Sequence, residues 1–244
     1  MLTGTGLLHT TVRSDVYLRY VKEGLRPYLV TSGLLLVALG LAGLAAELVH
    51  RLREPVADPA EEQDGHGHGG DDHGHGQGAG RHVAWLLAAP ALTLMFVAPP
   101  ALGSYTASRD GAASGSEQSA YGDLGNAPTT PMALEEFIGR SVHAPKTLDG
   151  REVRLLGFVS GGKSPDTWYL NRLKLSCCAA DARTLHVEMH SGKAPDNDTW
   201  VEVTGVLEPG HVTIENPVPT MTAEVVKPVT PPRNPYLDAP PTDG

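Results

Sequence analysis

The sequence predicts a membrane helical hairpin followed by a soluble, mainly β domain that forms a small OB-like barrel of five to six strands. Two long apolar stretches, residues 28–46 and 83–108, contain no charged side chain. After residue 130 the chain changes to short segments that alternate apolar and polar residues, as strands do. A helix rises about 1.5 Å per residue and the hydrocarbon core is about 30 Å thick, so about 20 apolar residues span a membrane.

Both apolar stretches lack the polar face that a helix of a soluble protein usually shows. Residues 34–42 read Leu-Leu-Leu-Val-Ala-Leu-Gly-Leu-Ala, without a polar position at helical spacing. The alternative is a pair of helices buried in a soluble core. In the second stretch Pro90 could kink a membrane helix, and Pro99-Pro100 marks a place where it could end. We therefore predict a multi-pass protein of the cell membrane, in contact with lipid.

The domain organisation follows from these two helices. The residues before the first helix form a tail, and residues 2–9 look like the end of another apolar segment, cut short by the start of the chain. The residues after the second helix form a linker of Ser, Ala, Gly, Thr and Pro. The predicted segments are the tail 1–27, the helix 28–49, the loop 50–81, the helix 82–105, the linker 106–130, the β domain 131–236 and the tail 237–244.

Two signals disagree about the side of the membrane on which the β domain lies. Four basic residues, Arg13, Arg19, Lys22 and Arg26, precede the first helix, and the positive-inside rule then favours a cytoplasmic N-terminus. Two spans would return the chain to the cytoplasm. The weakly charged linker suits an outside location, and a lost upstream helix would invert the topology. We favour the extracytoplasmic side.

The loop between the helices has the composition of a metal-binding segment. It contains two His-Gly-His units among acidic and glycine residues, a composition that cannot bury enough surface to fold. Imidazole suits zinc, copper, nickel and cobalt, and carboxylates add oxygen ligands. The alternative is a solvated linker without a metal. The candidate metal ligands in the loop are His66, His68, His73, His75, Asp71 and Asp72.

The β domain is predicted to begin with a short helix. Thr130 is a plausible N-cap, Pro131 fits the first turn, and Leu134, Phe137 and Ile138 form one apolar face. Short alternating strands follow, as in an OB-fold, although the usual helix before the fourth strand is missing from residues 191–199. The predicted strands are 152–160, 168–176, 185–190, 200–208, 211–215 and 220–226.

The two cysteines of the chain, Cys177 and Cys178, are adjacent, so they cannot connect distant parts of the fold. With Asp181 they could bind a soft or borderline metal such as zinc. Adjacent residues of a strand point to opposite faces, so both thiols can bind one ion only if the chain turns there. One alternative is a strained disulfide between the two neighbours, and another is one buried cysteine and one that shapes a loop. His186 and His190 are close in sequence, and His186 is the more typical of a structural residue.

These residues also support a resemblance to a known family. The helical pair around a His-rich loop, followed by a β domain with Cys177-Cys-Ala-Ala-Asp181, resembles the bacterial YcgQ-like family of permease subunits. The resemblance implies a two-component complex in which this subunit pairs with a separate multi-span permease. Members often begin with a further membrane helix, which this chain lacks. The matching segments begin at Tyr17-Leu-Arg-Tyr, Arg154-Leu-Leu-Gly, Trp200-Val-Glu-Val and Pro232-Arg-Asn-Pro.

The predicted function is that of a non-enzymatic accessory subunit of a membrane permease that handles zinc or another divalent metal. The net charge of −9 argues against a nucleic-acid partner. No nucleophile elbow, zinc-protease motif, P-loop or dinucleotide fingerprint occurs, so we predict no enzyme activity. One alternative is a membrane-tethered barrel that recognises a protein or an oligosaccharide, with the loop as a spacer. Another is a thiol redox sensor, although the pair lacks Cys-x-x-Cys spacing.

Overall fold

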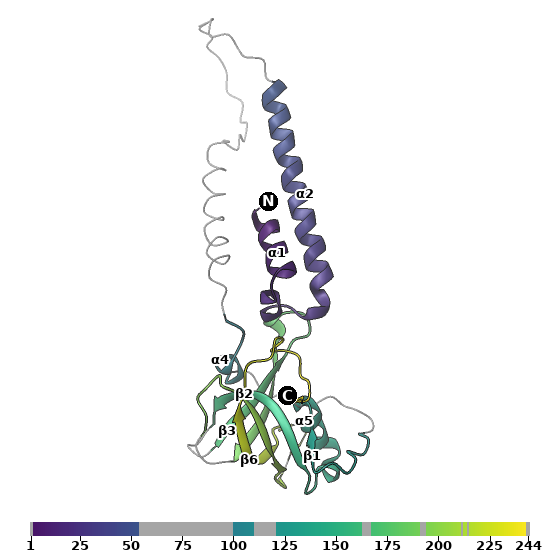
Figure 1. The fold of residues 1–244 in the computed structure, drawn as a ribbon, viewed down its shortest axis with the longest axis vertical. Coiled ribbons are helices and arrows are strands. Elements are labelled where there is room, and N and C mark those ends of the chain that lie inside the picture. Colours follow the sequence, from purple (N-terminus) through teal and green to yellow (C-terminus); the bar gives the residue numbers. More distant parts are fainter. Residues whose placement is uncertain are drawn as a thin grey trace, which may run out of the picture. The chain divides into compact units, whose positions relative to one another are not determined.

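The computed structural model describes residues 2–53, 100–109, 121–162, 167–190, 194–210, 212–213 and 215–242. The chain divides into two compact units, which are described separately. The first contains residues 1–14 and 26–99, and the second contains residues 15–25 and 100–244. Figure 1 shows the helices of the first unit and the sheet of the second. The chain therefore enters the second unit twice, once before and once after the long helix.

The described part of the first unit consists of two packed helices, α1 (Leu2–Val12) and α2 (Arg26–Arg53). They approach closely at two glycines, because a Cβ atom at Gly4 would lie 2.8 Å from the carbonyl oxygen of Gly33, and one at Gly33 would lie 2.9 Å from Leu8. The sequence analysis assigned these residues to a tail in which residues 2–9 look like the end of another apolar segment, and the structure forms helix α1 there. Helix α1 has 11 residues, which at about 1.5 Å each is too short to span a bilayer.

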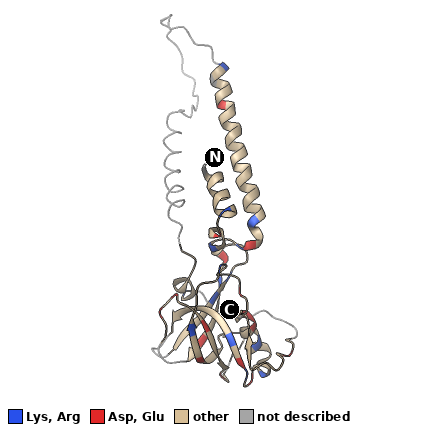
Figure 2. Cartoon of the chain, viewed as in Figure 1, with Lys and Arg blue, Asp and Glu red and all other residues tan. Residues whose placement is uncertain are grey.

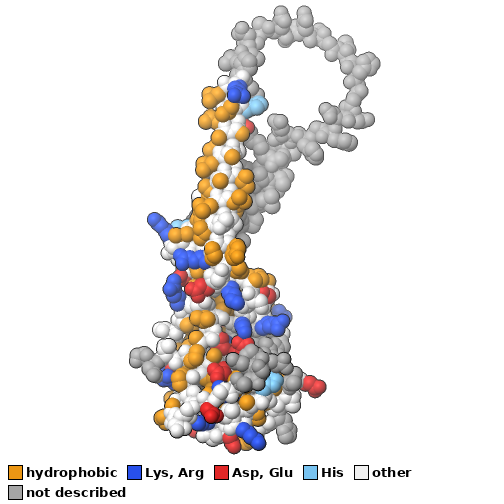
Figure 3. Space-filling model, turned by 90° about the vertical axis from the view of Figure 1, so that its right-hand side faces the viewer, with side chains coloured by type: hydrophobic (Ala, Val, Ile, Leu, Met, Phe, Trp, Pro, Cys, Tyr) orange, Lys and Arg blue, Asp and Glu red, His pale blue; other side chains and the backbone are white. Residues whose placement is uncertain are grey.

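Helix α2 covers the predicted span 28–49 and extends it at both ends. It is 28 residues long and therefore about 42 Å in length. Its charged side chains lie only near its ends, and apolar side chains cover the surface between them (Figures 2 and 3). Among the described residues, this is the one helix that is long and apolar enough to cross a membrane.

The second predicted helix, 82–105, falls largely outside the described residues. Where the description resumes, residues 100–103 are not helical, and a separate short helix, α4, spans Ser104–Ala107. The predicted end at residue 105 is therefore wrong. Pro99 and Pro100 explain the difference, because proline lacks the N–H group that a continuing helix needs.

The second unit is built on a mixed sheet of six strands. Their order is β1-β2-β3-β4-β6-β5, and β2 also pairs with β5. The pairs β1–β2 and β4–β6 are parallel, and the other pairs are antiparallel. Pairing therefore runs from β2 through β3, β4, β6 and β5 back to β2. The strands are β1 (Thr129–Pro131), β2 (Glu152–Gly161), β3 (Thr167–Lys174), β4 (Arg183–His190), β5 (Trp200–Leu207) and β6 (Thr220–Pro228).

Five of the predicted strands correspond to β2 through β6, and the described residues of the predicted strand 211–215, which are 212, 213 and 215, are not in a strand. The described residues of 209–219 contain no strand, and β5 pairs directly with β6. Alternation is clear in β5, where Val201 and Val203 are fully buried while Glu202 and Thr204 are partly exposed. Alternation identified these strands because one face of each points into the core.

Helix α5 (Leu134–His143) packs the predicted apolar face of Leu134, Phe137 and Ile138 into this core. Its N-terminus differs from the prediction. Thr130 lies in β1, and the first helical residue is Leu134. The side chain that caps the helix comes from the far end of the chain, because the Asp238 carboxylate accepts hydrogen bonds from the backbone N–H groups of Leu134 (3.0 Å) and Glu135 (2.7 Å).

Asp238 also lies beside Arg172 of β3. The guanidinium is 1% exposed, its Nε lies 3.6 Å from the Asp238 carboxylate, and its Nη2 donates to the Leu237 carbonyl. It stacks over the Trp200 ring at 5.0 Å. Burial lowers the pKa of Arg172, and the charge of Asp238 opposes this shift. Residues 237–244 were predicted as a tail, but Leu237 and Asp238 form specific contacts with α5 and β3.

Residues 15–25, predicted as part of a tail, also belong to the second unit. They form two short 3-10 helices, η1 (Val16–Arg19) and η2 (Glu23–Leu25). Tyr17 and Leu18 are buried. The Tyr236 hydroxyl donates to the Arg19 carbonyl (3.0 Å) and accepts from the backbone N–H of Leu102 (2.9 Å). One side chain thus joins the segment before α2 to the segment that follows residue 99.

Candidate metal centre

Cys177, Cys178 and Asp181 lie in a tight turn between β3 and β4. The turn ends in a one-turn 3-10 helix, η4 (Ala179–Asp181). The Asp181 carboxylate folds back and accepts hydrogen bonds from the backbone N–H groups of Ser176 (3.0 Å), Cys177 (2.7 Å) and Cys178 (3.4 Å). A short acidic side chain in this position satisfies N–H groups that a turn leaves without partners.

The turn is held from its other side by residues 20–22 of the same unit. The backbone N–H of Lys22 donates to the Cys177 carbonyl (3.0 Å), and that of Ala179 donates to the Tyr20 carbonyl (2.7 Å). Val21 and Cys178 form an isolated antiparallel bridge. The backbone of both cysteines is therefore fixed by a segment more than 150 residues earlier in the chain.

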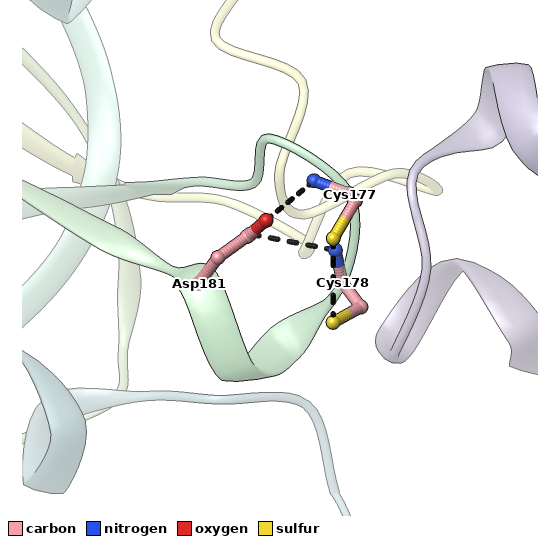
Figure 4. Close-up of side chains that lie close together, drawn as sticks. All are labelled: Cys177, Cys178 and Asp181. Carbon is pink, nitrogen blue, oxygen red and sulfur yellow. Dashed lines mark hydrogen bonds between the residues drawn. The ribbon is translucent and has the colours of Figure 1, made fainter.

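The geometry brings three potential ligand atoms together. The two sulfur atoms and a carboxylate oxygen of Asp181 all lie within 4.8 Å of one another. The two Sγ atoms are 3.6 Å apart, and Figure 4 shows both thiols on the same turn as the carboxylate. Cys177 is exposed, and Cys178 and Asp181 are partly exposed. Both thiols can bind one ion only if the chain turns at the cysteines, and the structure has that turn.

The contacts at the turn shift the ionisation of Cys177 and Asp181 in opposite directions. The hydrogen bond of the Cys177 thiol to the Asp181 carboxylate raises the pKa of Cys177 to about 11, and the neighbouring Cys178 thiol adds to the effect. The same hydrogen bond, with those from the backbone N–H groups, lowers the pKa of Asp181. At neutral pH the carboxylate is therefore ionised and Cys177 holds its proton. A metal ion that binds the sulfur must displace that proton.

Two sulfurs and one oxygen form a donor set that suits borderline and soft ions such as Zn²⁺ or Cu⁺. Zinc sites with four protein ligands are closed, whereas sites with three leave one position for water or another ligand. The exposed turn supplies three ligands, so it corresponds to the second kind of site, with one position open. Among the described residues, this is the one group of three His, Cys, Asp or Glu ligands with such spacing.

The histidines of the β domain lie elsewhere. His186 is buried, and its Nδ1 lies 2.7 Å from Oδ1 of Asn171, so it belongs to a hydrogen-bonded part of the sheet. His190 pairs with Thr167, at the opposite end of β4 from Arg183. His190 lies seven positions along the strand from Arg183, which is about 23 Å. Neither histidine joins the cysteine turn.

The candidate ligands of the loop, His66, His68, Asp71, Asp72, His73 and His75, lie outside the described residues. Sequence reasoning identified Cys177, Cys178 and Asp181, but it missed the clamp that residues 20–22 form on the turn. No local signal could have found that clamp, because backbone groups make it. In the structure Cys178 is the N-cap of η4 and Asp181 is the third residue after it, which is the spacing of a capping box.

Residues 134–237 match the family model described as the DUF1980 C-terminal domain. The matched segment runs from the first residue of α5 to the residue before Asp238, and it contains the whole cysteine turn. This match fits the resemblance to the YcgQ-like family. No curated protein matches the chain.

Proposed function

We propose that this protein is a membrane-anchored accessory subunit of a permease and that it binds zinc or a similar metal ion at Cys177, Cys178 and Asp181. One observation carries the proposal. Two sulfurs and a carboxylate oxygen lie within 4.8 Å of one another on an accessible turn. A site with three protein ligands and an open position exchanges its ion more readily than a closed site. Such a site suits a protein that passes an ion on to a partner.

The path of the chain supports a membrane hairpin. Residues 15–25 and 100–109 belong to the same folded unit, so they lie on the same side of any membrane. If α2 crosses the bilayer, the chain must cross back between residues 54 and 99. Residues 82–99 contain no Asp, Glu, Lys or Arg, and their one histidine, His82, carries a charge only at low pH. As a helix, these 18 residues would be about 27 Å long. Between residues 54 and 99, this is the apolar stretch that is long enough to cross back through the membrane.

This topology would place the two candidate metal regions on opposite sides of the membrane. The His-rich loop would lie on one side, and the cysteine turn on the other with the β domain. The loop would then raise the local ion concentration at the entrance or exit of a permease. It could not deliver an ion to the cysteines directly, so a multi-span partner would have to carry the ion between them.

We propose further that the sheet is a small OB-like barrel. The circuit of pairs from β2 through β3, β4, β6 and β5 back to β2 supports this assignment. So does the parallel pairing of β4 with β6, which lies between antiparallel pairs. The same circuit is the observation that favours the alternative function, a tethered barrel that recognises a protein or an oligosaccharide.

Zinc titration of the full-length protein in detergent, followed by calorimetry, tests the proposed function. We expect two classes of site in the parent protein. The variant with His66, His68, His73 and His75 changed to Ala should retain only the class at the turn. Adding Cys177→Ser and Cys178→Ser should remove it, whereas the neighbouring control Ser176→Ala should not. Zinc binding at the turn that survives the double cysteine change would contradict the proposal, and so would its absence from the histidine variant.

A further inference from the structure

The cysteine turn holds two sulfur atoms together in a way that a β-strand does not. Neighbouring side chains of a strand point to opposite faces. In the turn, the Sγ atoms of Cys177 and Cys178 lie 3.6 Å apart, and Figure 4 shows both on the same bend of the backbone. The chain has no other cysteine, and both thiols are free. The pair is therefore an isolated dithiol, and its first member is exposed.

The distance between the sulfurs fits a bent centre. Two sulfurs 3.6 Å apart, each about 2.3 Å from a common atom, make an angle of about 100° at that atom. Two sulfurs on opposite sides of an ion would have to lie about 4.6 Å apart at the same bond length. Trivalent arsenic forms bonds of similar length to sulfur, and its lone pair holds three ligands in a pyramid with angles of this size. The dithiol can therefore bind such a centre with its backbone in place.

The backbone of the dithiol is held from two sides. The Asp181 carboxylate accepts hydrogen bonds from three consecutive backbone N–H groups, and the Tyr20 carbonyl and the Lys22 N–H bond the turn from its other side. A ligand that uses both sulfurs therefore meets them already ordered, which lowers the entropy cost of binding. Zinc takes four ligands and finds three at the turn. A trivalent centre is complete with two sulfurs and one group that it retains from solution.

We propose that the turn also binds trivalent arsenic hydroxides of the form R–As(OH)2, where R is a hydroxyl or an organic group. Each thiol gives its proton to an arsenic-bound hydroxyl, which leaves as water while the sulfur forms a bond to arsenic. The product carries R–As on both sulfurs, two water molecules are released, and arsenic remains trivalent, so no oxidant or reductant takes part. Both ligand classes use the same dithiol, so the inference rests on the proposed function for its site but not for zinc or for a permease.

Phenylarsine oxide is the probe, because its phenyl group occupies R and leaves two positions for sulfur. The full-length protein in detergent is titrated with it, and intact mass spectrometry with a count of free thiols gives the stoichiometry. We expect one phenylarsenic group per chain and the loss of both thiols. Cys177→Ser and Cys178→Ser should each weaken binding at least about 100-fold, because the second bond is intramolecular only when both sulfurs are present. The neighbouring control Ser176→Ala should bind like the parent.

Two variants of Asp181 test the contribution of the ordered turn. Asp181→Asn keeps an oxygen for the backbone N–H groups, so the affinity for phenylarsine oxide should stay within about twofold. Asp181→Ala removes that acceptor and loosens the turn, so the affinity should fall about tenfold. An affinity that Asp181→Ala does not reduce would overturn the inference. Binding that either single serine variant retains, or arsenic that bridges two chains, would also overturn it.

Zinc titration of the same samples separates this site chemistry from the proposed function. Loss of phenylarsine oxide binding from a protein that still binds zinc at the turn would overturn only the arsenic inference. Binding of phenylarsine oxide, with the expected response to the serine variants, would support that inference even if zinc did not bind. The absence of zinc would then contradict only the proposed function.

Discussion

Two surface clusters of the β domain each contain three side chains of metal-ligand type. In only one of them do the ligand atoms lie close enough together to contact one ion. At the cysteine turn, both sulfurs and the Asp181 oxygen lie within 4.8 Å of one another. Around His190, Glu208 lies 3.0 Å from Nδ1 and Glu188 lies 3.5 Å from Nε2. The two carboxylates therefore face opposite edges of one imidazole ring.

The difference shows that composition does not make a metal site. Each nitrogen of His190 already faces a carboxylate, so the ring separates the two acidic groups, and no single ion can contact all three residues. At the turn, three ligands lie within five residues and the chain bends between them. Convergence follows from that bend, which Asp181 and residues 20–22 hold in place.

The largest effect should come from removing the sulfurs. In the protein without the four loop histidines, Cys177→Ser with Cys178→Ser should weaken zinc binding at least about 100-fold, because two of three ligands lose their thiolates. Cobalt substitution would show the same change as loss of sulfur-to-metal absorption. A cobalt spectrum that the double change does not alter would place the metal elsewhere.

The pH dependence should then separate the turn from the loop. Because the pKa of Cys177 is raised to about 11, its thiol stays protonated across the usual pH range, and each ion bound must displace that proton. Zinc affinity at the turn should therefore rise about tenfold per pH unit for this thiol, from pH 6 to beyond pH 8. Affinity at the loop should level off above the imidazole pKa of about 6.5. Zinc titrations at several pH values, with the histidine variant and the cysteine variant side by side, would measure both profiles; identical profiles would contradict the assignment.

The substitution Asp181→Asn tests whether Asp181 acts as a metal ligand or only as the hydrogen-bond acceptor that holds the turn. The amide keeps one oxygen to accept from the backbone N–H groups of the turn, but it removes the charge next to the metal. We expect zinc affinity to fall about tenfold with little change in thermal stability. The pKa of Cys177 should also fall toward its ordinary value, and thiol alkylation rates against pH would detect this. A large loss of stability with unchanged affinity would make Asp181 a purely structural residue.

The smallest effect should come from the second cluster. Glu208→Gln removes one of the two carboxylates beside His190, where all three side chains are partly exposed. The unfolding free energy should change by less than about 1 kcal/mol, and zinc binding should not change. Thermal unfolding and zinc titration of the full-length variant would measure both. A loss of zinc binding here would remove the contrast between the two clusters.

The sequence identified much of the fold because the relevant signals are local. The charge-free stretch before residue 47 indicated α2, alternation indicated β2 through β6, and the spacing of Leu134, Phe137 and Ile138 indicated the buried face of α5. It erred where a neighbour in space decided the outcome. Thr130 was expected to cap α5, but it lies in β1 because it pairs with β2. The residues after the Pro209-Gly210 turn were expected to form a strand, but β6 pairs with β5 instead.

By itself, the sequence determined which residues this protein can use: an apolar helix long enough for a membrane, a His-rich acidic loop, and two adjacent thiols with a carboxylate three residues on. Tertiary structure decided which distant segments of the second unit contact one another. Asp238 caps α5 across about a hundred residues, Tyr236 connects Arg19 to Leu102, and the Tyr20–Lys22 backbone clamps the cysteine turn. Periodicity and residue chemistry are written along the chain, whereas contacts between distant segments depend on packing of the whole unit, which no local pattern encodes.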